Sequence, residues 1–192
     1  MTKKEEIIQA CIHLICQKGI DLSSMQDIGK EVGLTKSSLY FYFDSKESLI
    51  NEVYMYCHNK DVKACNEGID ELHHTIDKLI KRFDNIINYA IDHPQLAKVE
   101  NIMEVAPQYQ TIIHLASQDF MNDILNIVDE GIDHQEIVDI PDWLIAQAYY
   151  GFCESMYKKF IFHPDLWEDE KIKSYCHEII KNIFKREENK NV

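Results

Sequence analysis

The sequence has few residues that break helices and no long apolar run. Six glycines and four prolines among 192 residues argue against long loops or extensive disorder. No apolar run reaches about 18 residues, the length that a helix needs to cross a bilayer. The first six residues, Met1 to Glu6, lack the apolar region of a signal peptide. We therefore expect an ordered chain that works in the cytoplasm.

The sequence also lacks the common catalytic motifs. It has no G-x-S-x-G, no glycine-rich phosphate loop and no H-E-x-x-H. One Glu-x-x-His stands at Glu71 and His74, but carboxylate di-iron bundles need two such motifs and two further glutamates. We therefore expect no enzyme, no bound metal and no cofactor.

No two cysteines form a C-x-x-C pair, and reduced thiols in a cytosolic protein mostly pack like small hydrophobic residues. Redox sensing or metal binding by some of them stays open. The six cysteines are Cys11, Cys16, Cys57, Cys65, Cys153 and Cys176.

Arginine is scarce, and the formal net charge is −13, which as a whole repels a polyanion. The charge is uneven, because residues 1–60 carry seven lysines and eight acids while the remainder carries 13 basic and 25 acidic groups. If the first part binds nucleic acid, its affinity must come from a few well-placed phosphate contacts. Two copies of the chain would be needed for useful affinity.

What the sequence does contain is a helix-turn-helix pattern between Ser24 and Leu49. Ser24 is a good N-cap, and an acid follows three residues later, as in a short capping box. Gly33 stops the first helix, because glycine adopts the left-handed conformation without steric cost. Thr35 then caps a second short helix, with Ser38 at its third position. Such a unit presents one helix to the major groove of DNA.

The following residues make the pattern more specific. Leu39 to Phe43 end the second helix in aromatic residues, and Ser45-Lys46-Glu47 open another helix. Here the sequence resembles the TetR/AcrR (Tet repressor) family of bacterial transcription regulators over roughly its first 50 residues. The matching residues are Lys4, Ile7, Ile8, Ala10, Gly19, Met25, Asp27, Ile28, Gly33, Leu34, Leu39, Tyr40, Tyr42, Phe43, Ser45, Lys46, Glu47 and Leu49.

The sequence departs from the family pattern at four positions. Gly29 replaces the usual alanine, Ser37 the usual small residue, often glycine, Tyr42 a common histidine and Lys4 a common arginine. Gly29 is expected to soften its helix by up to ~1 kcal/mol relative to alanine. Ser37 and Tyr42 leave the operator sequence open.

The second helix of the unit is expected to read DNA. The hydroxyls and the lysine at its start can reach base edges, and the residues after it are placed for phosphates, together with the backbone N–H groups that open the next helix. Replacing Lys46 by alanine is expected to flatten the salt dependence of binding by about one unit. The predicted DNA-binding set is Ser24, Met25, Thr35, Lys36, Ser37, Ser38, Tyr40, Tyr42 and Lys46.

Beyond this unit the periodicity predicts only helices, so the expected fold class is all-α. The expected helices cover 46–66, 70–92, 95–105, 108–130, about 141–163, and a last one from 165 or 168, with an acidic loop over 131–141. We expect a DNA-binding domain at 1–48 and an effector-binding and dimerisation domain at 49–192.

Two stripes near the end of the chain predict a homodimer. One consists of small residues at helical spacing and the other of apolar residues with a 4-3-4 spacing. The resemblance implies that the last two helices build a four-helix interface with a partner copy. The alternative is that both stripes complete the core of one chain. The predicted interface is Ala148, Gly151, Ser155, Ile172, Cys176, Ile179 and Ile183.

The resemblance further implies a cavity for a small effector among the middle helices. Core packing is the alternative for each aromatic residue or methionine there, and Glu100, Glu104 or Glu154, if buried, would favour a cationic ligand. The predicted lining is Phe83, Ile87, Met103, Tyr109, Phe120, Met121, Tyr149, Phe152 and Met156.

The sequence thus predicts a dimeric repressor that binds double-stranded operator DNA with palindromic symmetry and is released by a small, lipophilic effector. Activation instead of repression stays open. The alternative function is a helical ligand- or protein-binding module that has lost DNA binding.

Overall fold

The computed structural model describes residues 1–186, which fold into α-helices joined by short connections. The all-α prediction is confirmed. In chain order the elements are α1 (Lys3–Lys18), α2 (Met25–Glu31), α3 (Lys36–Leu39), α4 (Lys46–Cys65), α5 (Thr75–Asp92), α6 (Pro94–Glu104), the 3-10 helix η1 (Pro107–Tyr109), α7 (Gln110–Asp133), α8 (Asp142–Phe162), α9 (Pro164–Glu168) and α10 (Glu170–Phe184).

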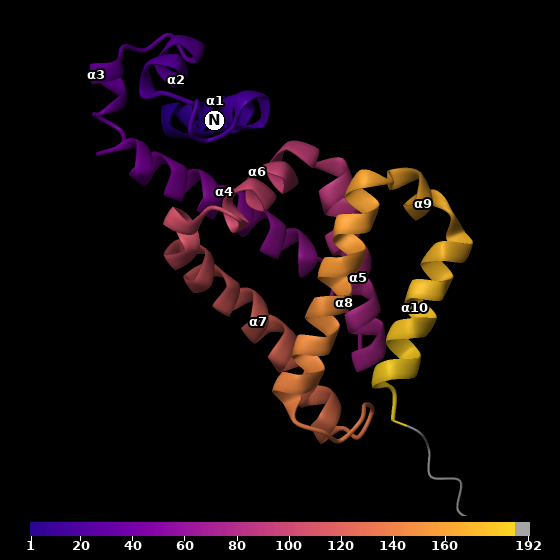
Figure 1. Ribbon diagram of the computed structural model, residues 1–192. Helices are drawn as coiled ribbons and strands as arrows, with labels where there is room; N and C mark the ends of the chain where they lie inside the picture. Colours follow the sequence, from indigo (N-terminus) through magenta and orange to yellow (C-terminus); the bar gives the residue numbers. More distant parts are fainter. Residues whose placement is uncertain (187–192) are drawn as a thin grey trace, which may run out of the picture. The chain divides into compact units, whose positions relative to one another are not determined.

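The chain divides into two compact units. The first combines Met1–Lys60 with His93–Ala116. Within it, α1 packs against both α2 and α6, and α2 packs against α3 (Figure 1). Buried isoleucines of α1 and the buried Leu39 of α3 give this small unit a core of its own.

The second unit combines Asp61–Asp92 with the residues from Ser117 onward. Here α8 and α10 both pack against α5, and α9 contacts α8 and α10. The Tyr149 hydroxyl on α8 donates a 2.7 Å hydrogen bond to the Leu79 carbonyl on α5, deep in the core. Phe83, Phe160 and Trp167 belong to the same apolar cluster as Tyr149, and the Trp167 ring contacts the other two.

Two expected helix boundaries are wrong. α5 begins at Thr75 rather than at 70, because the chain turns through Gly68, whose φ is +72°, a value that favours glycine. α7 continues to Asp133 through Gly131, which was expected to open the acidic loop. A Cβ on Gly131 would lie 2.5 Å from Thr75 Cγ2, so the glycine serves the close approach of α7 and α5.

The described residues hold neither a membrane span nor a metal cluster. None of the helices in 1–186 is both long and apolar enough to cross a bilayer. Over the same residues no three His, Cys, Asp or Glu side chains gather closely enough to hold a metal ion. The predicted domain boundary between residues 48 and 49 stays a prediction.

Candidate functional site

The start of α2 is fixed by a reciprocal cap. The Ser24 hydroxyl accepts a hydrogen bond from the Asp27 backbone N–H at 3.2 Å, and the Asp27 carboxylate accepts from the Ser24 backbone N–H at 3.3 Å. These bonds satisfy N–H groups that a helix start leaves without partners. The capping prediction is confirmed, and Gly33, with φ +67°, follows the end of the helix as expected.

The turn between α2 and α3 depends on a glycine inside α2. The Leu34 backbone N–H donates to the Gly29 carbonyl at 2.8 Å. A Cβ built on Gly29 would lie only 2.6 Å from the Leu34 carbonyl oxygen. The expectation that Gly29 merely softens the helix is therefore incomplete, because this turn as it stands leaves no room for alanine.

The reading helix α3 is a single turn, shorter than the sequence suggested. Thr35 caps it as predicted, since its hydroxyl oxygen accepts from the Ser38 backbone N–H at 3.1 Å. Leu39 is fully buried and anchors the turn to the core. Three predicted residues at its start, Thr35, Lys36 and Ser37, are exposed.

The other predicted contacts surround this exposed start. Ser38 is half-buried, and its hydroxyl lies 2.8 Å from that of Thr35. Tyr40 and Tyr42 are exposed beyond the helix, and the Lys36 ammonium lies 5.9 Å from the centre of the Tyr40 ring. The predicted contacts thus lie at the exposed start of α3 and just beyond its end.

Two members of the predicted set differ in placement. The Ser24 hydroxyl lies at the surface, within 2.6 Å of the Asp27 carboxylate. The Met25 side chain is buried and supports α2 from inside. Because a buried side chain cannot reach DNA without unfolding its helix, we withdraw Met25 from the proposed contacts.

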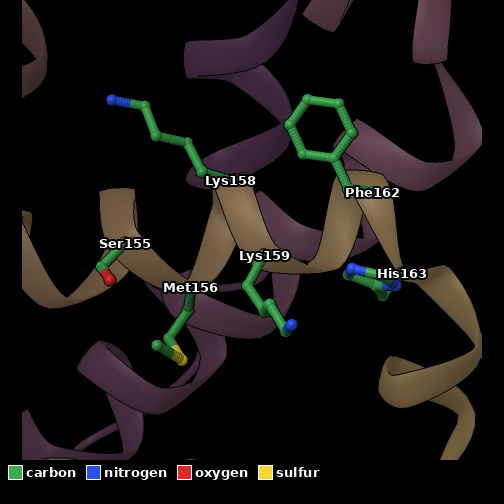
Figure 2. Close-up of a pocket in the computed structure, with 6 residues that line it drawn as sticks. All are labelled: Ser155, Met156, Lys158, Lys159, Phe162 and His163. Atoms are coloured by element: carbon green, nitrogen blue, oxygen red, sulfur yellow. The ribbon is translucent and has the colours of Figure 1, made fainter.

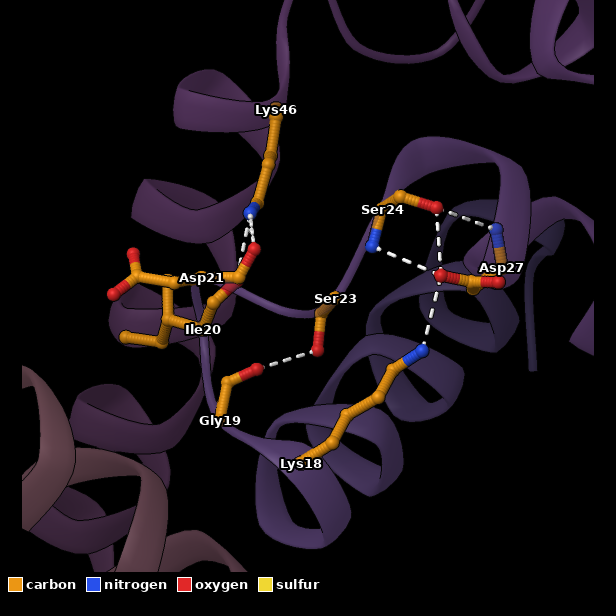
Figure 3. A network of polar contacts seen from close by, with 8 residues as sticks. All are labelled: Lys18, Gly19, Ile20, Asp21, Ser23, Ser24, Asp27 and Lys46. Atoms are coloured by element: carbon orange, nitrogen blue, oxygen red, sulfur yellow. Dashed lines mark hydrogen bonds and ion pairs between the residues drawn. The ribbon is translucent and has the colours of Figure 1, made fainter.

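Lys46 lies at the start of α4 and reaches the loop between α1 and α2, as Figure 3 shows. Its ammonium donates to the Ile20 carbonyl at 2.6 Å and approaches the Asp21 carbonyl at 3.4 Å. In the same loop the buried Ser23 hydroxyl donates to the Gly19 carbonyl at 2.7 Å. Lys46 therefore braces the loop that leads into Ser24, a role that the sequence did not suggest.

The same network holds a carboxylate with an altered pKa. Hydrogen bonds from Ser24 and Lys18 lower the pKa of the half-buried Asp27 to about 2. The Lys18 ammonium lies 3.0 Å from this carboxylate (Figure 3). Asp27 thus stays charged at neutral pH and connects α1 to the cap of α2.

Two exposed residues outside the predicted DNA-binding set, Lys30 and Phe41, stand close in sequence to it. Lys3, Lys4 and Lys18 are paired with acids, whereas Lys30, exposed on α2, forms no ion pair within residues 1–186. Phe41 follows α3 and is 87% exposed. An unpaired lysine suits a phosphate and an exposed aromatic ring suits an apolar base edge.

The predicted effector residues do not all share one unit. Met103 and Tyr109 are buried in the first unit. The other seven belong to the second, where Phe83, Ile87 and Tyr149 are fully buried. The seven are Phe83, Ile87, Phe120, Met121, Tyr149, Phe152 and Met156, all part of the core cluster or packed against it.

The centre of the second unit also contains a charged side chain that the sequence reasoning missed. Arg82 of α5 is fully buried, and its Nη1 donates to the Asn66 side-chain carbonyl. Its Nε and Nη2 have no hydrogen-bond partner among the described residues. An unsatisfied buried donor typically costs roughly 1–3 kcal/mol, and more when it is charged. Its position on the apolar face, between Leu79 and Phe83, was the signal in the sequence.

The acids that were considered for a cationic ligand lie elsewhere. Glu104 is exposed, and Glu154 pairs with Lys158 on the surface of α8. In contrast, burial raises the pKa of the Asp61 carboxyl on α4, against the opposing effects of a hydrogen bond from Cys65 and the charge of Arg82.

The predicted dimer residues divide between surface and core. Ala148, Gly151 and Ser155 form an exposed row on α8, and a Cβ on Gly151 would meet open space. Ile179 and Ile183 are exposed on α10. Cys176 is buried and Ile172 packs against the core, so we withdraw Cys176 from the interface.

Further exposed apolar residues extend these two faces. They are Leu144 and Phe162 on α8 and Tyr175 on α10. Figure 2 shows a shallow surface hollow on the C-terminal half of α8, where Ser155 and Met156 lie beside Lys159 and Phe162. Of the predicted effector residues, only Met156 lines this hollow.

The cysteines pack as ordinary core residues. All but the half-buried Cys16 are buried, and none forms a disulfide. Burial raises the pKa of the Cys11 and Cys153 thiols to about 12. Since the thiolate is the reactive form, these two thiols are poor candidates for redox sensing.

Comparison with known sequences identifies the first unit. Residues 7–53 match the family model described as bacterial regulatory proteins, tetR family. The HTH-type transcriptional regulator YvdT of Bacillus subtilis (strain 168), itself uncharacterized, is 30% identical over 183 residues, covering 83% of this chain and 91% of YvdT. IcaR of Staphylococcus aureus, a negative transcriptional regulator of the biofilm operon icaADBC, is 31% identical over 106 residues, 55% of this chain and 49% of IcaR.

Solved structures share the fold over nearly the whole chain. FadR from Bacillus subtilis, crystallised with stearoyl-CoA, has a TM-score of 0.79 at 19% identity, covering 93% of this chain and 96% of that one. FadR from Bacillus halodurans, a fatty acid degradation regulator, has a TM-score of 0.82 at 16% identity, covering 94% and 95%. The capped helix-turn-helix, the helical second unit and the match to YvdT agree: the chain belongs to the tetR family and is a helix-turn-helix transcriptional regulator, in a family that is not enzymatic.

Proposed function

We propose that two copies of this chain bind a palindromic operator and repress transcription in the cytoplasm, and that a small lipophilic effector releases them. The observation that carries the proposal is the exposed start of α3, where Thr35, Lys36 and Ser37 project from a capped turn. Repression is favoured by IcaR, which is a negative regulator by name.

The proposed contacts fall into two groups. Side chains at the start of α3 read base edges, and Phe41 adds an apolar contact. The remaining side chains bind phosphates and set the register of the helix on the duplex. The proposed set is Ser24, Lys30, Thr35, Lys36, Ser37, Ser38, Tyr40, Phe41, Tyr42 and Lys46.

The proposed dimer uses the exposed faces of α8 and α10. Leu144, Ala148, Gly151 and Ser155 form an apolar or small row on one side of α8, and Phe162 follows on that side beyond Lys158 and Lys159. Small residues let a partner helix approach closely, and Ile179 and Ile183 widen the apolar area. A symmetric pair would present two reading helices to a two-fold operator.

The proposed effector enters the second unit. FadR from Bacillus subtilis, similar in fold, was crystallised with stearoyl-CoA, which supports a ligand with an acyl chain. The ligand needs only a higher affinity for the conformation that does not bind DNA. Its binding would then change the spacing of the two reading helices and lower the affinity for the operator.

Fluorescence anisotropy tests the DNA part. The full chain is titrated onto a labelled duplex from the DNA upstream of its own gene and onto a shuffled duplex. We expect Lys36→Ala to weaken binding to both and to reduce the salt slope by about one unit. Lys63→Ala, exposed on α4 outside the reading unit, is the matched control and leaves both values unchanged. No binding by the native chain to either duplex would favour the module that has lost DNA binding.

Sedimentation tests the dimer separately. Ile179→Glu places a charge on the exposed face of α10, and we expect it to shift the native dimer toward monomer. Val105→Glu, at another exposed apolar position, controls for the added charge. A native chain that sediments as a monomer at micromolar concentration contradicts the dimer.

A further inference from the structure

Arg82 is an unusual residue for its place. The chain has two arginines and eighteen lysines, so cationic side chains that only need solubility are almost all lysine. One of the two arginines is fully buried, on the apolar face of α5. A buried guanidinium without a carboxylate in salt-bridge distance is rare, because charges in cores are normally paired.

The contacts of Arg82 occupy one end and one face of its guanidinium. Nη1 donates to the Asn66 Oδ1, and the Asn66 amide in turn donates to the Asp123 carboxylate at 2.7 Å. The Phe120 ring lies with its centre 4.5 Å from the Arg82 Cζ. Residues that follow α4 or lie on α7 thus hold the planar group in one orientation.

The two donors without a partner lie on the same edge. Nε–H and one N–H of Nη2 point in parallel from the guanidinium, and both atoms are buried without a hydrogen bond among the described residues. This is the edge on which a carboxylate binds with two parallel hydrogen bonds. The Phe120 ring lies over the face of the guanidinium and not on that edge, so the contact with Phe120 and a bidentate ligand are compatible.

The surroundings favour a single negative charge over a double one. Asp123 reaches Arg82 through Asn66, and the partly buried Asp61 contributes a second carboxyl nearby on α4. A phosphate with two charges would add repulsion from these acids, whereas a carboxylate carries one charge. Phe83, on the same helix, and the buried Tyr149 of α8 supply apolar surroundings.

We propose that the effector carries a carboxylate on an apolar body, and that Arg82 holds this carboxylate through Nε–H and Nη2–H, inside the second unit. This inference rests on the proposed effector response and names the chemical class of the effector. It replaces the cationic ligand that the acidic residues suggested from the sequence.

Calorimetry provides the first test. Hexanoate, decanoate and hexadecanoate are titrated into the full chain beside the corresponding alcohols and decyltrimethylammonium. We expect at least one carboxylate to bind, and its alcohol to bind about tenfold or more weakly, since charge-assisted paired hydrogen bonds are lost. Arg82→Lys keeps the charge but loses the paired donors of the guanidinium, and should weaken binding of the carboxylate by a similar factor. Arg186→Lys, exposed near the end of α10, is the control and changes nothing.

A second measurement needs no substitution at Arg82. The two arginines of the native chain should give two Nε–H signals in ¹⁵N NMR, which the variant Arg186→Lys at an exposed site assigns. We expect the Arg82 signal to move downfield on addition of the binding carboxylate and to stay in place with the alcohol. If none of the three carboxylates moves the Arg82 signal or binds by calorimetry, the inference is wrong.

The operator assay separates this inference from the function on which it rests. Decanoate, decanoyl-CoA and decyltrimethylammonium are added separately to the protein–DNA complex. Release by the carboxylate, but not by its thioester, supports both ideas. Release by the thioester alone or by the cation alone supports an effector-responsive regulator and contradicts a carboxylate effector. Binding of the carboxylate at Arg82 without any release keeps the site but overturns its role as the effector site.

Discussion

The two units of this molecule satisfy their polar groups in different ways. In the first unit the partners are mostly close in sequence: Ser24 with Asp27, and Thr35 with Ser38, each pair three residues apart. In the second unit the partners come from distant helices, as with Asn66 and Asp123 or Tyr149 and Leu79. The second unit also contains a buried cation, Arg82, whose Nε and Nη2 have no hydrogen-bond partner among residues 1–186.

The difference fits the two proposed tasks. DNA always offers phosphates and base edges, so a surface that binds it can be fixed in advance by caps and turns. The proposed effector is present only at times, and donors that it satisfies would lack a partner in its absence. Substitutions in each unit test whether the two units differ in this way.

The largest effect is expected in the core of the second unit. Phe83→Ala removes a fully buried ring that packs on Phe152 and Trp167, and should lower the free energy of unfolding by ~3–5 kcal/mol. Phe41→Ala, at a ring that is 87% exposed and outside the proposed dimer faces, is the matched control and should change the stability by less than about 0.5 kcal/mol. Urea denaturation measures both. Equal losses would mean that the core of this unit lies elsewhere.

The next effect concerns the turn of the first unit. Helix propensity alone predicts that Gly29→Ala stabilises by up to ~1 kcal/mol. The approach to the Leu34 carbonyl predicts the opposite, a loss of ~1–3 kcal/mol from overpacking and weaker operator binding.

Gly151→Ala is the control for the glycine substitution. Its new Cβ meets open space within one chain, so propensity should dominate and thermal unfolding should shift upward. A stabilised Gly29→Ala variant with native DNA affinity would show that the turn adjusts freely. A weakened dimer in Gly151→Ala would add support for the proposed interface.

Lys46 distinguishes two roles by two readouts. If Lys46 only braces the α1–α2 loop, Lys46→Ala should cost about 1 kcal/mol of stability and leave the salt slope of DNA binding unchanged. If Lys46 contacts a phosphate, the role predicted from the sequence, Lys46→Ala should reduce that slope by about one unit. Thermal unfolding and anisotropy at several salt concentrations measure both, and a change in both values would assign both roles to one ammonium.

The smallest effect is a pH dependence at the cap of α2. The folded pKa of Asp27, about 2, lies below the ordinary value of about 3.9. A lowered pKa contributes stability above the unfolded value, and this contribution disappears as the pH falls from about 4 toward about 2. Asp27→Asn should reduce the change of the thermal unfolding midpoint with pH over this interval. An identical pH profile in both proteins would exclude Asp27 as the titrating group.

The sequence was most informative where structure is local. The caps at Ser24 and Thr35 and the left-handed Gly33 follow from rules that involve only neighbouring residues, and all three are confirmed. The same rules could not show that Gly29 faces the Leu34 carbonyl, or that Lys46 reaches back to Ile20.

Long-range packing limited the rest. Helical spacing placed Cys176 with Ile179 on one stripe, but only the neighbouring helices decide which of them is covered. Arg82 escaped notice because a single charge within an apolar stripe is usually assigned to the edge of that stripe. One residue of the predicted DNA-binding set, Met25, is therefore withdrawn. The predicted effector residues did not include Arg82, on which the proposed ligand chemistry depends.

The near contact of Gly131 with Thr75 has a consequence for recombination between relatives. Glu136, just past α7, also accepts a 2.6 Å hydrogen bond from the Thr75 backbone N–H. The start of α5 at Thr75 and the end of α7 with Glu136 therefore fit each other as a pair. A hybrid protein that takes one of these segments from another parent would lose the close fit at Gly131 and the hydrogen bond to Glu136. Chimaeras meant to exchange ligand preference should move both stretches together.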